Sequence, residues 1–534
     1  MKVALTNIGG SSPGTKPVSI SILTAVLKQK GHEVALFDTT FMDLGFRLDT
    51  EVSDELRMFK AVDWGHHGLK RERIDARQEW LRFLDREQPD LVAASAFSDM
   101  YKHTLEFMKV AKERLGVPII VGGIHTTLLP DEVIKEECVD AICVGEGEAA
   151  LLEYIDALDG RTVTRTDIQN LWIKKNGMIQ KNPLRPLAVL DDLPFFDYSL
   201  YDRRQFLRPY QGKVFRSGDF QDKRGCPRRC TYCAYAIINT EIYPRTRVAM
   251  YSPERFVEEA LYLTKTWDLQ FFKIFSEDIF VRHADDLAKI SELWAKKVNI
   301  PFTTSGYPIA VTKKKVELLK KMNCVSISLA LECGNAHYRE HMLKRKYTNE
   351  QFEEAIRMVQ DAGIRACSLN MVGLPRESRK MIFETIEANR TIRPDHADFG
   401  CFFPFRGTPL GDLAVEDKFA DPDEIKNSRS EHGNCILDMP QMSRDEVHGI
   451  IKVHHFYLYY PKVMWPIFAF CEKKGRWRHA IYRMLLWMDS SLKRLGIDPK
   501  DMARKIHAAR RREPSSRAPS GERPATIRHS EEVG

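Results

Sequence analysis

Three cysteines, Cys226, Cys230 and Cys233, stand close together near the middle of the chain. Their C-x3-C-x2-C spacing lets one loop present three thiolates to a cubic iron–sulfur cluster, and no fourth cysteine follows nearby to complete a four-thiolate set. The iron that lacks a protein thiolate would then offer a coordination site to a small molecule. Zinc completed by a distant His or Cys is the alternative, because structural zinc sites have four ligands.

The cysteine triplet resembles the signature of the radical S-adenosylmethionine (SAM) enzymes, including the aromatic Tyr232 just before the last cysteine. The resemblance implies a [4Fe-4S] cluster held by Cys226, Cys230 and Cys233, with SAM on the open iron and Tyr232 beside it. It also implies that the reduced cluster cleaves SAM to a 5′-deoxyadenosyl radical. No catalytic residue beyond these cofactor ligands is assigned.

Further motifs extend the resemblance over residues 215–415. Glu277 and Asp278 end one strand-like run, Glu332 stands in an A-L-E-C-G run similar to the family's G-I-E-S-G, and Arg345 follows at the spacing of a basic residue. Gly373 opens a G-L-P turn, and residues 403–410 are similar to a segment of the B12-dependent branch. The resemblance implies that the acidic residues and Arg345 contact SAM's amine and carboxylate, which opposite charge favours, and that Gly373 lies near its adenosine.

Residues 1–150 alternate short apolar runs with helical stretches, a pattern that predicts a parallel, doubly wound sheet. We expect strands near 3–5, 31–38, 91–95, 118–123 and 141–147, and helices near 19–29 and 104–115. Ligands of such sheets bind at the carboxyl ends of the strands, where this chain carries small polar residues and glycines. Without a family these glycines could equally form ordinary tight turns.

The V-G-G-I-H run at 121–125 and the G-E-G run at 145–147 resemble the cobalamin-binding domain that precedes many radical SAM domains. The resemblance implies cobalamin contacts from Asn7, Ser95, Gly122, Gly123, His125, Gly145 and Glu146. The D-x-H-x-x-G motif, whose His replaces the lower cobalt ligand, is missing from the sequence. We therefore expect His125 to contact a loop or the cobalamin tail, with a purely structural role as the alternative.

The predicted fold is α/β: an N-terminal Rossmann-like cobalamin-binding domain, a partial (β/α)6 radical SAM barrel and a helical C-terminal region. The predicted boundaries are 1–150 for the first domain, 151–212 for a linker, 213–438 for the barrel, 439–507 for the helical region and 508–534 for a disordered tail. The tail is rich in Pro, Ser and Arg, which disfavours a packed core.

Composition and charge indicate the cellular compartment of the protein and the surfaces that it contacts. The 534 residues are 43% hydrophobic and 29% charged, with eleven irregularly spaced cysteines, so we expect a cytoplasmic protein without a disulfide framework. Between Lys452 and Arg494, nine Lys and Arg accompany two acidic residues, a local charge of 9 − 2 = +7, among many aromatics. This segment is interpreted as a helical cap over the barrel, with peripheral membrane contact as the alternative. No nucleic-acid partner is expected.

The leading functional interpretation is a cobalamin-dependent radical SAM methyltransferase acting on an unactivated carbon through methylcobalamin and a 5′-deoxyadenosyl radical. A radical rearrangement or oxidative cyclisation without net methyl transfer is the alternative, and a non-catalytic cobalamin or redox sensor is a third reading that the SAM motifs disfavour. The expected partners are a small-molecule substrate, which the C-terminal aromatics suggest could be large and apolar, and an electron donor such as flavodoxin or ferredoxin.

Overall fold

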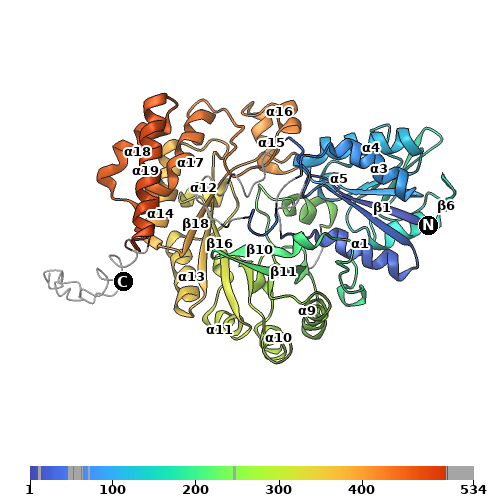
Figure 1. The fold of residues 1–534 in the computed structure, drawn as a ribbon, viewed down its shortest axis with the longest axis horizontal. Helices are drawn as coiled ribbons and strands as arrows, with labels where there is room; N and C mark the ends of the chain where they lie inside the picture. Colours follow the sequence, from blue (N-terminus) through green and yellow to red (C-terminus); the bar gives the residue numbers. More distant parts are fainter. Residues whose placement is uncertain are drawn as a thin grey trace, which may run out of the picture.

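The computed structural model describes residues 1–9, 14–45, 52, 62, 64–69, 72–244, 248–500 and 502. An N-terminal α/β domain lies on one side of a central barrel, and the C-terminal helices lie on the opposite side (Figure 1). The predicted tail at 508–534 and the last residues of the predicted helical region fall outside the described residues.

The N-terminal sheet has seven strands in the order β2-β1-β3-β4-β5-β8-β9. The first five run parallel, as the sequence predicted, and helices cover both faces. Leu5 packs in one buried cluster and its neighbour Ala4 in another, because a parallel strand between two helical layers is apolar on both faces. The strands are β1 (Lys2–Asn7), β2 (Glu33–Asp38), β3 (Leu91–Ser95), β4 (Ile119–Gly122) and β5 (Ala141–Cys143), and the main helices are α1 (Val18–Gln29), α3 (Ala76–Glu87), α4 (Tyr101–Leu115) and α7 (Glu148–Asp156).

Two antiparallel strands, β8 (Leu171–Lys175) and β9 (Met178–Lys181), extend this sheet into residues expected to form a linker. Ile173 on β8 is buried in the same core as the parallel strands. The chain then crosses to the barrel through residues 182–206, where Phe196 and Tyr198 are buried as well.

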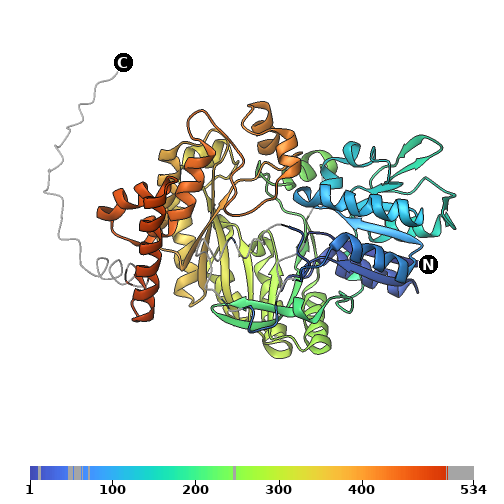
Figure 2. The same cartoon turned by 45° about the horizontal axis from the view of Figure 1, so that its top comes forward.

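The barrel sheet is curved and has the order β10-β11-β14-β15-β16-β17-β18 (Figure 2). Six of these strands are parallel, which confirms the predicted partial (β/α)6 barrel, and β10 pairs antiparallel with β11. The strands β11 and β15 were not predicted. The bounds are β10 (Leu207–Tyr210), β11 (Lys213–Gln221), β14 (Phe271–Phe275), β15 (Phe302–Gly306), β16 (Cys324–Glu332), β17 (Arg365–Val372) and β18 (His396–Cys401).

Helices cover the outer face of the barrel. Ile327 and Leu329 on β16 are fully buried on this outer side, so the alternate residues of the strand point inward. The flanking helices are α9 (Pro253–Trp267), α10 (Ala284–Lys297), α11 (Lys313–Lys321), α13 (Asn349–Asp361) and α14 (Arg379–Ile392).

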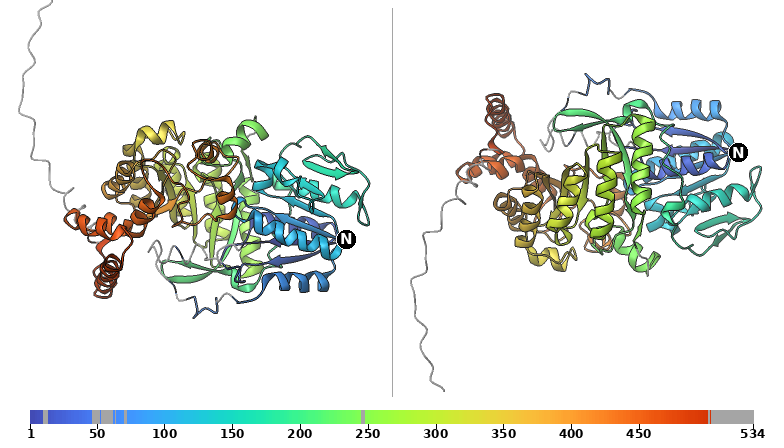
Figure 3. Two further views of the ribbon diagram at one scale, coloured as in Figure 1. Left: turned by 90° about the horizontal axis from the view of Figure 1, so that it is seen from above. Right: turned by 90° about the horizontal axis from the view of Figure 1, so that it is seen from below.

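The C-terminal region is helical, as predicted, and extends from the barrel on the side opposite the N-terminal domain (Figure 3). Its helix α17 (Arg444–Tyr459) packs on α14 and β18, while α18 (Trp465–Glu472) and α19 (Arg476–Arg494) lie further out. None of the helices in the described part of the chain combines the length and the apolar character that crossing a membrane requires.

Candidate cluster and cofactor site

The strand β11 leads directly into the cysteine loop. A short strand, β12 (Lys223–Arg224), follows it and ends at Gly225, whose φ of +93° is a left-handed conformation that favours glycine. Within the loop the Cys233 amide donates to the Cys230 carbonyl at 3.0 Å. The Asn239 side chain donates to the Cys226 carbonyl at 2.6 Å and so ties the loop to the helix that follows.

The three thiols of this loop are the right donor set for an iron–sulfur cluster. Cys230 is buried, and Cys226 and Cys233 are partly exposed. Burial raises the pKa of Cys226, and it raises the pKa of Cys233 to about 12. Such thiols become ligands when a metal centre displaces their protons. Among the residues that the structure describes, no three His, Cys, Asp or Glu side chains meet as ligands of one metal ion.

Three of the predicted SAM residues meet beside Cys230. The Tyr232 hydroxyl donates to the Glu332 carboxylate at 2.6 Å, and the Arg345 guanidinium donates to the Tyr232 oxygen at 2.8 Å. Arg345 also lies 3.5 Å from Glu332 and 3.6 Å from the Cys230 sulfur. Glu332 and Arg345 are 7% and 5% exposed, so this ion pair is buried next to the cysteine loop.

The backbone of Glu332 is unusual. Its φ is +63°, and the register between β16 and β17 shifts just before it. A left-handed conformation is uncommon for a residue with a side chain and is held here by the surrounding fold, as often happens at functional sites. The bulge turns the carboxylate toward Tyr232 at the inner edge of the barrel.

Two tyrosines that nothing in the sequence pattern singled out complete this network. The Tyr307 ring lies 4.5 Å from the Arg345 guanidinium and 4.0 Å from that of Arg228, a residue of the cysteine loop. Tyr347 accepts a hydrogen bond from Arg345 at 3.0 Å. Tyr307 follows β15, the strand that was not predicted, so the usual signal of a polar residue at a strand end was lost.

The two acidic residues after β14 have different environments. Glu277 accepts hydrogen bonds from Lys223 at 2.9 Å and Tyr235 at 3.0 Å, and its side chain remains 35% exposed. Asp278 is fully buried and accepts from the backbone amides of Phe280 and Tyr307. Glu277 is therefore the acid accessible to a ligand, while Asp278 fixes the loop, and a SAM contact from either stays a prediction.

Gly373 ends β17 with a φ of +73°. A Cβ at this position would lie 2.9 Å from the Cys435 sulfur, so a side chain would both strain the backbone and displace its neighbour. In the same turn the buried Glu377 accepts from the Leu374 amide at 3.1 Å, and burial raises the pKa of Glu377 to about 8. The turn is thus shaped tightly, and its contact with SAM stays a prediction.

The predicted cobalamin residues lie along one edge of the N-terminal sheet. Asn7, Ser95, Gly122, Gly123, His125, Gly145 and Glu146 all stand at or just after the carboxyl ends of parallel strands. A Cβ on Gly123, whose φ is +95°, would lie 2.7 Å from the Ala96 backbone, so the two loops approach each other closely.

His125 is buried against the Tyr101 ring, with 4.0 Å between the ring centroids, and its Nδ1 lies 3.1 Å from the Ser98 hydroxyl. Burial lowers the pKa of His125 to about 4, so the imidazole is neutral at pH 7. Within the described part of the chain, His125 Nε2 and Asn7 Nδ2 are buried and have no hydrogen-bond partner. Orphaned polar atoms at this edge fit a polar ligand such as cobalamin, which would satisfy them.

Glu146 joins this edge to the cysteine loop. Its carboxylate accepts from Arg224 at 2.8 Å and from the Ala188 amide at 2.7 Å, and Glu148 accepts from the other nitrogen of Arg224 at 2.6 Å. A Cβ on Gly145 would lie 2.3 Å from the hydroxyl of Tyr243, which follows the cysteine loop. Because the Glu146 carboxylate already has these partners, its contact with cobalamin stays a prediction.

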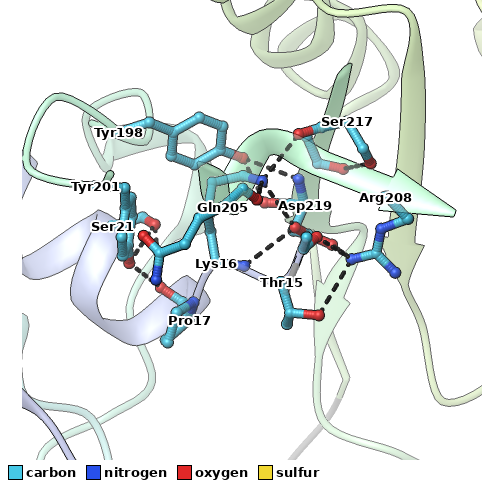
Figure 4. A network of polar contacts seen from close by, with 12 residues as sticks. Thr15, Lys16, Pro17, Ser21, Tyr198, Tyr201, Gln205, Arg208, Ser217 and Asp219 are labelled. Atoms are coloured by element: carbon cyan, nitrogen blue, oxygen red, sulfur yellow. Dashed lines mark hydrogen bonds and ion pairs between the residues drawn. The ribbon is translucent and has the colours of Figure 1, made fainter. Parts of the chain in front are cut away.

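A second connection between the domains is centred on Asp219 (Figure 4). Lys16, from the loop after β1, is fully buried; its ammonium lies 3.2 Å from the Asp219 carboxylate and donates to the Ser217 carbonyl at 2.8 Å. Arg208 pairs with the other oxygen of Asp219 and donates to the Gly14 carbonyl at 2.7 Å. Asp219 and Arg224 both lie on the segment that leads into the cysteines, so both connections hold the N-terminal sheet against the cluster loop.

Comparison with known proteins agrees with this arrangement. The B12 binding domain family matches residues 2–155, and the Radical SAM superfamily matches residues 222–388. The uncharacterized methyltransferase PH0819 of Pyrococcus horikoshii is 24% identical over 454 residues, which cover 84% of this chain and 85% of that protein. The anaerobic magnesium-protoporphyrin IX monomethyl ester cyclase of Rubrivivax gelatinosus is 26% identical over 62% of this chain and 58% of that protein.

Among solved structures, the radical SAM methyltransferase TsrM from Kitasatospora setae, with cobalamin and a [4Fe-4S] cluster bound, superposes with a TM-score of 0.58 at 17% identity. The match covers 78% of each chain. The two family matches follow the order of the two folds, and the cysteine loop lies within the Radical SAM match, near its start. The chain belongs to the radical SAM enzymes that carry an N-terminal B12-binding domain.

Proposed function

We propose that the protein transfers a methyl group from SAM to an unactivated carbon of a small molecule, with a [4Fe-4S] cluster and cobalamin as cofactors. The observation that carries this proposal is the paired contact of Arg224 with Glu146 and Glu148, which holds the cobalamin edge against the cluster loop. Methyl transfer is favoured because a relative that aligns over most of both chains is named a methyltransferase.

When bound, the cluster supplies an electron and an open iron for SAM, and cobalamin supplies a carrier for the methyl group. The chain's own residues bind and orient these groups. Cys226, Cys230 and Cys233 would hold the cluster. Lys223 and Tyr235 fix the Glu277 carboxylate, whose exposed part suits the SAM ammonium.

Arg345 and Tyr232 would act mainly by shaping the SAM site. The Arg345 guanidinium already donates to Tyr232, Tyr347 and the Ala330 carbonyl. These bonds fix its position, and its positive charge next to Cys230 would stabilise thiolate ligands. Because these hydrogen bonds hold Arg345 in place, it positions Tyr232 and Tyr347. Its positive charge also favours the binding of a carboxylate group nearby.

A radical cyclisation without methyl transfer is the second candidate, because the Rubrivivax relative is named a cyclase. Both reactions need an electron donor, for which flavodoxin or ferredoxin is proposed. All eleven cysteines are free, which suits the reducing cytoplasm in which we place the protein.

We also propose that the outer face of α18 and α19 binds an anionic membrane surface. Trp477 and Trp487 are 81% and 67% exposed, and Arg476, Arg483 and Arg494 are exposed on the same side of α19. The only acidic residue of α19, Asp489, is buried and paired with Lys493. Exposed tryptophans among cations match the interface of an anionic bilayer.

Flotation with phosphatidylcholine vesicles, with and without phosphatidylglycerol, tests the membrane proposal. We expect the protein to float only with the anionic vesicles and the W477A/W487A variant to lose this binding, while the control I309A, which removes another exposed apolar residue, keeps it. Equal binding by all three proteins, or retention on nucleic acid in place of vesicles, would contradict it.

The test of the methyl transfer is comparative mass spectrometry of the native host and a deletion strain, both fed methyl-labelled methionine. A product that carries the label and is missing only from the deletion strain is the expected result. Complementation with C230A should fail to restore it. A missing product without the label would favour cyclisation or rearrangement over methyl transfer.

A further inference from the structure

The inner face of the barrel is polar toward the amino ends of its strands. Strand register aligns one residue from each of five neighbouring strands, and we call this set the inner row. Its residues are on the face opposite the buried Phe220, Phe272 and Ile327, which pack against the helices. The members of the inner row are Asp219, Lys273, Thr303, Ser326 and Arg365.

Positive charge exceeds negative charge around this row. Asp219 is its only carboxylate, and both oxygens of Asp219 are already paired, one with Lys16 and one with Arg208. Lys16, Arg208 and Lys273 thus lie around one acid, a local balance of 3 − 1 = +2, and Arg365 stands at the other end of the row.

Lys273 has no counter-ion in the described part of the chain. Among the described residues no carboxylate lies within ion-pair distance of its ammonium, and the Phe275 ring lies 6.0 Å away, the outer limit of a cation–π interaction. Burial and the nearby Arg208, opposed by Asp219, lower the pKa of Lys273 to about 8, so the ammonium is still mostly protonated at pH 7. A partly buried charge without a partner is costly, and an anionic ligand would offset that cost.

The position of Lys273 suits a substrate contact. It lies two residues before Phe275 on β14, which is ~7 Å of strand, and Glu277 follows at the strand end. An anion held by Lys273 would therefore lie deeper in the barrel than SAM's proposed partner Glu277. The rest of the substrate would extend toward the cluster loop, where the reacting carbon belongs.

We propose that Lys273 binds a carboxylate or phosphate group of the substrate inside the barrel. This inference rests on the proposed function and names the substrate class as an anionic small molecule. It departs from the large apolar substrate that the C-terminal aromatics suggested. Those aromatics lie in the C-terminal helical region, on the side of the barrel opposite the N-terminal domain.

The test uses the full-length protein in the deletion strain fed methyl-labelled methionine. The strain is complemented with wild type, K273M, K273R or K265M, the last replacing an exposed lysine of α9 as the matched control. We expect K273M to lower the product at least about tenfold, because a charge-assisted hydrogen bond is lost, K273R to restore part of it, and K265M to equal wild type. Purified K273M should keep its cluster absorbance and its substrate-free SAM cleavage, which shows that it folds.

The charge of the product is the second readout. Electrophoresis at pH 7 should show an anion, with methyl esterification neutralising a carboxylate and alkaline phosphatase removing a phosphate monoester. A neutral or cationic product, or wild-type yield from K273M, would overturn the inference. An unlabelled product would refute methyl transfer alone, because the same product charge and variant comparison would still decide the role of Lys273.

Discussion

The Tyr232 hydroxyl donates a 2.6 Å hydrogen bond to the Glu332 carboxylate, joining two residues that are 100 positions apart in the sequence. One lies between the last two cysteines of the cluster loop, and the other ends β16 in a left-handed conformation. The bond fixes the distance between the cluster loop and the far wall of the barrel. Through Arg345, it also sets the charge next to Cys230.

The Y232F variant should weaken SAM binding about tenfold or more without loss of the cluster. The change removes the donor to Glu332 and the acceptor for Arg345, and leaving buried charged groups without partners costs about 1–3 kcal/mol for each. Titration calorimetry with SAM and iron analysis of the reconstituted protein measure the two effects. Y262F, at an exposed tyrosine of α9, is the control. Loss of iron from Y232F would contradict the prediction that Tyr232 supports SAM binding and not the cluster.

The C230A variant should lose its iron and all SAM cleavage while it still binds cobalamin. Cys230 is in the barrel loop, whereas the orphaned atoms of Asn7 and His125 are in the N-terminal domain. Iron content, SAM cleavage and the cobalamin spectrum of the purified variant give the three readouts. C471A removes a buried cysteine of α18 and should keep all three properties; SAM cleavage by C230A would exclude the cluster.

The D219N variant should destabilise the protein by about 3–5 kcal/mol, because Lys16 would remain buried without its counter-charge. K28M is the matched control, since Lys28 and Asp197 form a solvent-exposed ion pair whose loss should cost about 0–1 kcal/mol. Urea denaturation followed by tryptophan fluorescence compares the two. Similar stabilities for D219N and K28M would show that burial adds nothing to the Lys16 pair.

Acid should destabilise the N-terminal domain through His125. Its pKa falls from 6.5 to about 4 on burial, so the unfolded chain binds a proton more readily than the folded domain. The stabilisation is complete above pH 6.5 and is lost as the pH falls toward 4, a change of about 3 kcal/mol.

Unfolding free energies between pH 7.5 and 4.5 should therefore fall less steeply for H125Q, which cannot take up the proton. H479Q, at an exposed histidine of α19, should leave the slope unchanged. A wild-type slope in H125Q would mean that other groups cause the acid sensitivity.

The strands that were not predicted, β11 and β15, show which features of a sequence reveal a strand and which conceal it. A strand-like run and two motifs led to Glu277, Glu332 and Gly373, which stand at or just after the carboxyl ends of β14, β16 and β17. By contrast, β11 and β15 place Asp219 and Thr303 on the inner row, so their polar residues resemble loops when read locally. The polar residues that made β11 and β15 hard to recognise in the sequence are the same residues that make the barrel interior polar.

The contacts between domains lay beyond prediction for another reason. Lys16 and Asp219 are 203 residues apart, and a single lysine before a proline carries no periodic signal. The same holds for Arg224 and Glu146, which are 78 residues apart, although both stand next to motifs that were identified. Motifs locate a cofactor's contacts, but the pairing of domains depends on surfaces that only the folded chain brings together.

The burial of Lys16 also limits how the molecule can move. Pulling the N-terminal domain away from the barrel would leave an ammonium, a guanidinium and a carboxylate to be rehydrated together, next to the strand that carries the cysteines. Hinged opening between the two domains would thus be a costly motion in each catalytic cycle. We expect the substrate to enter the barrel and the product to leave it while the cobalamin edge and the cluster loop stay fixed relative to each other.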